Sequence, residues 1–167
     1  MNRKILFTSF TTWLPHQKSN SSDDLLQEIL NLRDRDSFLR QLPVDIELAS
    51  NLAIARIAEL EPDIIICCGM AESRNQLTVE AKASDREIVL NTQVNLPQLI
   101  AGIDSVEISY DAGKFVCEGL YYSILKYLQS SQLSSHCIFV HIPILNPENF
   151  TDVKSSFLTI VQRLTLV

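Results

Sequence analysis

Glycine is scarce in this sequence: 4 of 167 residues, beside 6 prolines. This excludes collagen-like, low-complexity and Pro/Gly-rich disordered chains. It also leaves no glycine-rich phosphate-binding pattern of the P-loop or dinucleotide type. Long apolar runs are missing too, and the longest, residues 64–68, is far too short to span a bilayer. Near the N-terminus, Arg3 and Lys4 precede only three apolar residues, which is not a signal-peptide core. We therefore expect a cytoplasmic protein with no membrane partner.

Positive charge is also limited, since 14 Lys and Arg face 20 Asp and Glu for a net charge of −6. An acidic chain with no basic cluster repels phosphate backbones, so no nucleic-acid partner is expected. The four cysteines should be reduced in the cytoplasm, where a special cysteine is a reactive thiol rather than half of a disulfide. Apolar residues make up 46% of the chain, enough to bury a core, and residues 1–167 are expected to form a single domain.

Apolar stretches of strand length and helix length alternate along the chain. This order predicts an α/β fold, a three-layer α/β/α sandwich around a mostly parallel twisted sheet. The continuous apolar run 64–68 is typical of a strand buried on both faces of such a sheet. Strands are expected at residues 4–10, 42–44, 63–69, 86–90, 106–109 and 137–142. Helices are expected from the N-cap, Ser21 or Ser22, through Leu30, and at residues 46–60, 114–128 and 150–164.

In an α/β sheet the site lies in the loops that follow the strands. Here these loops are residues 10–20, 69–80, 110–117 and 141–147, where polar and unusual residues gather.

The cysteines fall into two environments. Cys67 and Cys68 lie in the apolar run and Cys137 opens a strand, so all three are expected to be core residues. Cys117 follows a strand-to-helix turn and lies in the first turn of a helix. A helix N-terminus stabilises a thiolate and offers N–H groups to an oxyanion, so Cys117 is the candidate reactive thiol, although a structural role stays open.

The histidines and acids offer two further candidates. His141 ends an apolar strand, where it either faces the site or is a structural histidine with its hydrogen bonds satisfied. His16 and His136 are expected to be solvated. Glu80 follows the loop that begins at Gly69, and from its spacing alone an ordinary surface charge is the better explanation. Metal-ligand spacing is missing, so neither a metal nor a cofactor is expected.

Four segments in order resemble the pyroglutamyl-peptidase I family (pyrrolidone-carboxylate peptidases) of cysteine peptidases. Residues 42–69 are similar to the family's central region, and the acid Glu80 stands beyond a turn, residues 69–74, that resembles G-x-A-G-G-R. Residues 109–117 resemble the nucleophile motif D-A-G-x-Y-x-C, and residues 139–143 the strand F-x-H-x-P.

The resemblance implies an α/β/α peptidase that releases an N-terminal pyroglutamate from a small peptide. It makes Cys117 the nucleophile, His141 the base and Glu80 the group that orients His141. A thiol needs a neighbouring imidazole of fixed tautomer to attack an amide, and an acyl-enzyme would follow.

The resemblance also implies substrate-binding residues. Phe10 and Trp13 fall where the family has two phenylalanines that sandwich the lactam ring. Met70 and Arg74, in the turn after the buried strand, are the other expected contacts.

The sequence also departs from the family. Glu72 and Ser73 replace two glycines, which would cost about 1–3 kcal/mol if these positions need positive φ. Glu118 stands beside Cys117 in place of an asparagine and would weaken the thiol unless it points away.

Only 36 residues separate Glu80 from Cys117, fewer than in the family. The shortened segment lacks a site arginine, which Arg74 or Arg86 could replace. It also lacks an arm used in oligomer contacts, so a monomer or small homo-oligomer is expected.

Two other functions remain open. One is a cysteine amidase acting on another small lactam or amide, because the recognition loops have changed most. The other is a catalytically weak binding module on the peptidase scaffold, favoured by Glu118 and the lost glycines.

Overall fold

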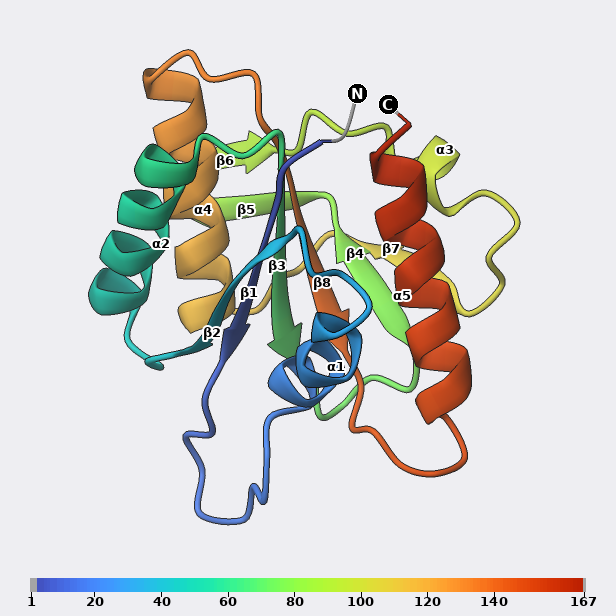
Figure 1. Ribbon diagram of the computed structural model, residues 1–167. Helices are drawn as coiled ribbons and strands as arrows, with labels where there is room; N and C mark the ends of the chain where they lie inside the picture. Colours follow the sequence, from blue (N-terminus) through green and yellow to red (C-terminus); the bar gives the residue numbers. More distant parts are fainter. Residues whose placement is uncertain (1–2, 167) are drawn as a thin grey trace.

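A six-stranded sheet forms the centre of the fold, in the order β2-β1-β3-β8-β4-β7 (Figure 1). The computed structural model describes residues 3–166. Its strands are β1 (Ile5–Phe10), β2 (Ser37–Leu42), β3 (Ile64–Met70), β4 (Leu77–Glu80), β5 (Lys82–Asp85), β6 (Ile88–Asn91), β7 (Val106–Ser109) and β8 (His136–Ile142). Its helices are α1 (Ser21–Leu30), α2 (Ile46–Leu60), α3 (Leu96–Ile100), α4 (Val116–Ser130) and α5 (Phe150–Leu164).

Helices cover both faces of this sheet, as the sequence predicted. Strand side chains such as Leu6 and Phe139 pack against α2 and α4, whereas their neighbours Phe7 and Val140 pack against α1, α3 and α5. This alternation is the two-residue period of a strand with both faces covered. All seven residues of β3 are buried, which confirms the prediction from its continuous apolar run.

The sheet is mostly parallel, with one reversal. β2, β1, β3 and β8 run parallel, whereas β4 pairs antiparallel with β8 and parallel with β7. The register across the reversal sets Thr78 opposite His141 and Glu80 opposite Phe139. β4 therefore carries Glu80 to the strand that holds His141, although the two residues are distant in sequence.

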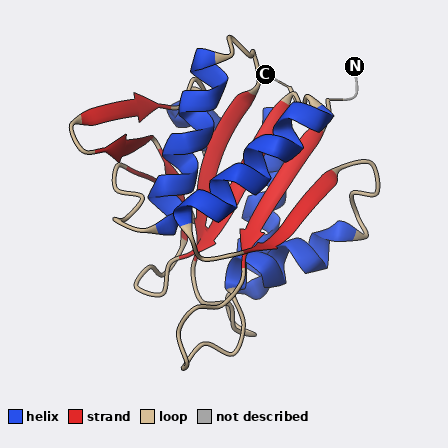
Figure 2. Cartoon of the chain, turned by 90° about the vertical axis from the view of Figure 1, so that its left-hand side faces the viewer, coloured by secondary structure: helices blue, strands red, loops and turns tan. Residues whose placement is uncertain are grey.

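Several short elements differ from the sequence prediction. The second strand is β2, residues 37–42 rather than 42–44, because a half-exposed edge strand lacks the alternation that marks a buried one. β4, β5 and α3 were not predicted from the sequence, because they are too short to show a period. The strand predicted at 86–90 is β6, which pairs with β5 in a separate hairpin sheet (Figure 2).

Two helices differ from the sequence prediction at their ends. Asn20, rather than Ser21 or Ser22, is the N-cap of α1, and its side chain accepts a hydrogen bond from Ser22 N at 3.1 Å. Helix α4 spans Val116–Ser130 instead of residues 114–128 and still places Cys117 in its first turn.

The core residues include three cysteines. Cys67, Cys68 and Cys137 are 0%, 0% and 2% exposed, which confirms that they act as small hydrophobes. His136 is not solvated as expected, since it is half-buried and its Nδ1 atom has no hydrogen-bond partner among the described residues. None of the helices in residues 3–166 has the length and apolar character needed to cross a bilayer.

Candidate active site

The predicted site loops meet around a cavity of about 330 Å³ beyond the carboxyl ends of β3 and β8. Trp13 comes from the loop after β1, Met70 and Arg74 from the end of β3 and its following turn, and His141 from β8. The loop before α4 forms the remaining wall of the cavity. The lining residues are Trp13, Met70, Ala71, Ser73, Arg74, residues 111–117 and His141.

The Cys117 thiol lies directly over the backbone of β3. A Cβ atom added to Gly69 would stand 2.7 Å from Cys117 Sγ and 2.9 Å from Phe139 Cζ, closer than real Cβ contacts allow. Gly69 therefore creates the space that the sulfur occupies. Gly69 also pairs with His141 across β3 and β8, so the sulfur sits beside the strand position of the imidazole.

The His141 ring is fixed by Glu80. Its Nδ1 atom lies 2.6 Å from Glu80 Oε1, and the ring packs on Phe139 with centroids 4.8 Å apart. An ionised carboxylate only accepts hydrogen bonds, so Nδ1 carries the proton and Nε2 is the nitrogen left for proton exchange in the cavity. Both His141 and Cys117 line that cavity.

Glu80 is fully buried yet stays ionised. Burial raises the pKa of its carboxyl group, but the hydrogen bond and charge of His141, together with Arg74, outweigh it and hold the pKa below its usual value. A buried carboxylate that carries charge needs such partners, because an unpaired charge in the interior is expensive.

Arg74 connects the acid to the loop that carries the cysteine. Its Nη1 atom lies 2.5 Å from Glu80 Oε1, contacts Thr78 Oγ1 and stands 3.5 Å from His141 Nδ1. Its Nη2 atom donates to the Asp111 carbonyl oxygen at 2.7 Å. Of the two arginines considered as replacements, Arg74 is therefore at the site, whereas Arg86 is exposed in the turn between β5 and β6.

The Cys117 thiol is neutral in the resting site. Burial, with smaller contributions from the Glu80 carboxylate and Cys67, raises the pKa of Cys117 to about 12, although Arg74 opposes the shift. Glu118 does not add to this effect, because its carboxylate turns to β5 and accepts from Ser84 N and Oγ at 3.1 and 2.7 Å. The weakening expected from Glu118 therefore does not arise.

Helix α4 starts without a side-chain cap at Phe115, unlike the capped α1, α2 and α3, as far as the described residues go. Just before it, Gly113 takes a φ of +92° and donates to Asp111 Oδ1 at 3.0 Å. The first N–H groups of α4 thus remain available to an oxyanion at Cys117.

Three of the four predicted substrate-binding residues line the cavity. Trp13, Met70 and Arg74 line the cavity, but Phe10 does not: it is 1% exposed and packs in the core layer beneath α2 and α4. The structure thus argues against a direct contact between Phe10 and the substrate. The Phe10 side chain lies on the face of β1 that packs against α2 and α4. Phe115, 52% exposed, is an aromatic wall that the sequence analysis assigned no role.

The turn that lost two glycines carries no backbone strain. Neither Glu72 nor Ser73 has a positive φ, so the cost expected for replacing glycine there does not arise. The turn instead follows a path open to ordinary residues.

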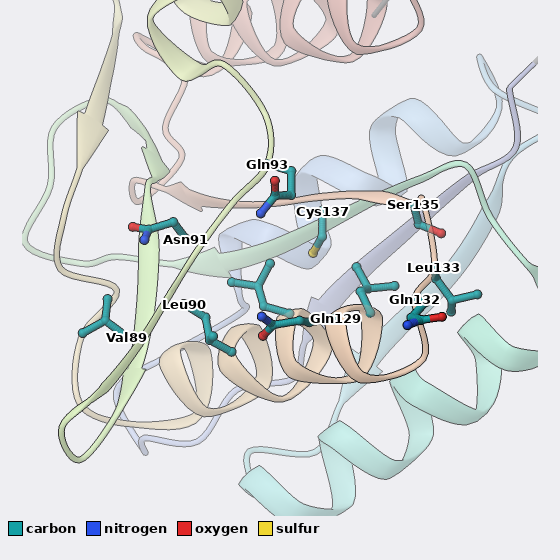
Figure 3. Close-up of a pocket in the computed structure, with 11 residues that line it drawn as sticks. Val89, Leu90, Asn91, Gln93, Gln129, Gln132, Leu133, Ser135 and Cys137 are labelled. Carbon is teal, nitrogen blue, oxygen red and sulfur yellow. The ribbon is translucent and has the colours of Figure 1, made fainter.

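A larger cavity, of about 570 Å³, lies elsewhere, between β6, the end of α4 and the start of β8 (Figure 3). Its walls are leucines and side-chain amides such as Gln93 and Gln129, and its one thiol is the core residue Cys137. No charged residue lines it among those described, so the candidate chemistry belongs to the smaller cavity. No group of three His, Cys, Asp or Glu side chains within residues 3–166 could hold a metal ion.

Comparisons with known proteins point to one family. No protein-family model matches the sequence. The pyrrolidone-carboxylate peptidase of Thermoanaerobacter sp. (strain X514) is 29% identical over 169 residues, which cover 85% of this chain and 83% of that protein. The enzyme of the same name from Bacillus subtilis (strain 168) is 25% identical over 189 residues, covering 96% and 86%.

Solved structures agree in fold. Pyroglutamyl peptidase I from Bacillus amyloliquefaciens matches with a TM-score of 0.87 at 20% identity, over 100% of this chain and 97% of that one. The E192I mutant of pyrrolidone carboxyl peptidase from Pyrococcus furiosus matches with a TM-score of 0.81 at 16% identity, over 95% and 96%. At this identity the likeness establishes the fold.

Fold and cavity together define an α/β protein whose site brings a thiol, an imidazole and a buried carboxylate to one edge of the sheet. Its sequence relatives agree with this description. The chain is similar to the pyrrolidone-carboxylate peptidases, and the resemblance indicated by its motifs is confirmed.

Proposed function

We propose that this chain is a cysteine exopeptidase that hydrolyses the amide bond after an N-terminal pyroglutamate. The observation that carries the proposal is the 2.6 Å hydrogen bond between His141 Nδ1 and Glu80 Oε1, in a cavity that Cys117 also lines. The names of the sequence relatives support the substrate class, a small peptide with N-terminal pyroglutamate.

In the proposed reaction the sulfur of Cys117 attacks the pyroglutamyl carbonyl carbon while its proton passes to His141 Nε2. Because the thiol pKa is raised to about 12, proton transfer accompanies attack and no preformed thiolate is required. The tetrahedral oxyanion is stabilised by N–H groups at the start of α4.

Collapse of the intermediate completes the first half of the reaction. His141 then gives its proton to the leaving amine, and the carbon–nitrogen bond breaks to leave a thioester at Cys117. Water, deprotonated by His141, hydrolyses that thioester and releases pyroglutamate. The Glu80 carboxylate offsets the positive charge that the imidazole carries in both halves.

Hydrolysis of a pyroglutamyl aminomethylcoumarin amide tests the proposal. We expect steady release of the fluorophore by the parent chain and a loss on the order of 10⁴-fold in Cys117→Ala. Cys137→Ala, which removes a core thiol that does not line the cavity of Cys117 and His141, is the matched control and should keep kcat. Equal rates in the parent and Cys117→Ala would refute the nucleophile.

One observation favours a second function, a binding module that holds a lactam without cleaving it. A thiol whose pKa is raised to about 12 is a poor nucleophile unless the imidazole removes its proton. Calorimetric titration with a pyroglutamyl peptide, followed by mass spectrometry of the peptide, separates the two functions. Binding with an intact peptide after long incubation supports the module, and cleavage supports the peptidase.

A cysteine amidase acting on another small lactam or amide would respond differently. It would leave the pyroglutamyl amide intact and turn over a different amide, with the same loss in Cys117→Ala. A panel of lactam and short acyl amides therefore separates the reaction type from the substrate class.

A further inference from the structure

The side chain of Gln17 holds the part of the loop after β1 that carries Trp13. Its Oε1 atom accepts from the backbone N–H groups of Trp13 and Leu14 at 3.0 and 3.2 Å. The Gln17 backbone N–H in turn donates to the Leu14 carbonyl oxygen at 3.0 Å. These three bonds close the turn that holds Trp13.

The other end of the Gln17 amide reaches across to the turn after β3. Its Nε2 atom donates to Glu72 Oε1 at 2.7 Å, and His16 Nε2 lies 3.1 Å from both carboxylate oxygens of Glu72. The hydrogen bonds of Gln17 and His16 lower the pKa of Glu72, so its carboxylate is ionised at neutral pH. Residues 55 positions apart in sequence are thus joined at the rim of the cavity.

This clasp, Gln17 with Glu72, bears on the cavity through Trp13. Trp13 is 38% exposed and lines the same cavity as Cys117 and His141, yet it sits on a loop that extends beyond the carboxyl edge of the sheet (Figure 1). An exposed loop of this kind has little buried apolar surface to fix it. Hydrogen bonds that tie its backbone to a second loop supply the missing constraint.

We propose that Gln17 and Glu72 are positioning residues that hold Trp13 as a fixed wall of the cavity and thereby set the affinity for the acyl group of the substrate. The consequence for the substrate rests on the proposed function; the consequence for Trp13 does not. Neither residue lines the cavity, so both act through Trp13.

The sequence offers a direct probe, because Trp13 is its only tryptophan. Acrylamide quenching and fluorescence anisotropy of the full chain therefore report on this one side chain. In Gln17→Ala and in Glu72→Ala we expect the quenching constant to rise roughly twofold and the anisotropy to fall, as the indole gains fast local motion. The double variant should add little to Gln17→Ala, because that change already removes the bond to Glu72.

Two matched variants sharpen the test. Glu72→Gln keeps a carbonyl oxygen that can accept from Gln17 and should restore most of the parent signal. Lys18→Ala removes an exposed neighbour with no part in the clasp and should leave quenching unchanged. On the pyroglutamyl amide, KM should rise about fivefold in Gln17→Ala, the factor of one net hydrogen bond, while kcat stays close to the parent value.

Unchanged quenching and anisotropy in both Gln17→Ala and Glu72→Ala would overturn the clasp, even if the parent chain is an active peptidase. A loosened Trp13 with unchanged KM would overturn the claim on affinity. A parent chain with no turnover would count against the proposed function alone, because the fluorescence of Trp13 needs no substrate.

Discussion

His141 and Glu80 are 61 residues apart in sequence and share a hydrogen bond of 2.6 Å, made possible because β4 runs antiparallel beside β8. Arg74 bonds the same carboxylate oxygen and also holds the carbonyl oxygen of Asp111. The proposed proton relay and the loop before the nucleophile are therefore tied to a single buried carboxylate.

Glu80→Gln should lower kcat by about 10³- to 10⁴-fold with little change in KM, because an amide no longer fixes the working tautomer of His141. It should also destabilise the fold by about 3–5 kcal/mol, since Arg74 loses its charged partner. Steady-state kinetics and denaturant unfolding measure the two effects. Glu107→Gln, on the neighbouring strand β7 and exposed, is the control that should change neither. A Glu80→Gln variant with parental kcat would contradict the proposed relay.

The stability of the fold should depend on pH through Glu80. The pKa of Glu80 is lowered in the folded chain. The contribution of Glu80 to folding stability is therefore fully present above the ordinary carboxyl pKa of 4.5 and is lost as the pH falls from that value toward the lowered pKa of the folded chain. Thermal melting between pH 7 and pH 3 should therefore show a steeper loss of Tm in the parent than in Glu80→Gln. Parallel curves would mean that Glu80 has the same proton affinity in both states.

Alkylation should reveal a neutral Cys117 thiol. With a pKa of about 12, the thiolate fraction and hence the rate of reaction with iodoacetamide should rise about tenfold per pH unit between pH 7 and pH 10, without a plateau. Mass spectrometry identifies the modified residue, and Cys117→Ala accounts for reaction at the core thiols. A plateau with a midpoint below the ordinary value of 9.0 would show that the site stabilises the thiolate.

Gly69→Ala should damage catalysis more than folding. The new Cβ would stand 2.7 Å from Cys117 Sγ and must displace the thiol or Phe139, and a displacement of about 1 Å costs on the order of 10²-fold in rate. Gly119→Ala is a useful comparison, because its Cβ would meet Ile46 Cγ2, also at 2.7 Å, in the contact between α2 and α4. It should lower Tm and leave KM unchanged. A fully active Gly69→Ala variant would mean that the sulfur does not need its observed position.

The long elements were predictable because their side chains repeat with a clear period. The apolar run of β3 and the apolar face of α2 each dictate one structure, and the structure confirms both. The edge strand β2 and the four residues of β4 lack such a signal, because their positions depend on partners supplied by the rest of the sheet.

Some residues of the candidate site were likewise predictable from the sequence, and others were not. Motif order singled out Cys117, His141 and Glu80, but no local pattern shows that Arg74 reaches Asp111. Phe10 was predicted to touch the substrate, yet it faces the core because its direction is set by its place in β1. Contacts between loops distant in sequence are fixed only once the sheet has brought them together.

The proposed chemistry depends on the antiparallel pairing of β4 with β8, because this pairing places Glu80 beside His141. Neighbouring residues of a strand face opposite sides, so a slip of a single position would turn Glu80 toward α5 and present an aliphatic side chain to the imidazole. The Glu80 carboxylate cannot move gradually away from His141 while β4 and β8 keep their register. Any capacity for chemistry should consequently vanish at the same denaturant concentration as the antiparallel pairing itself, with no partly working form in between.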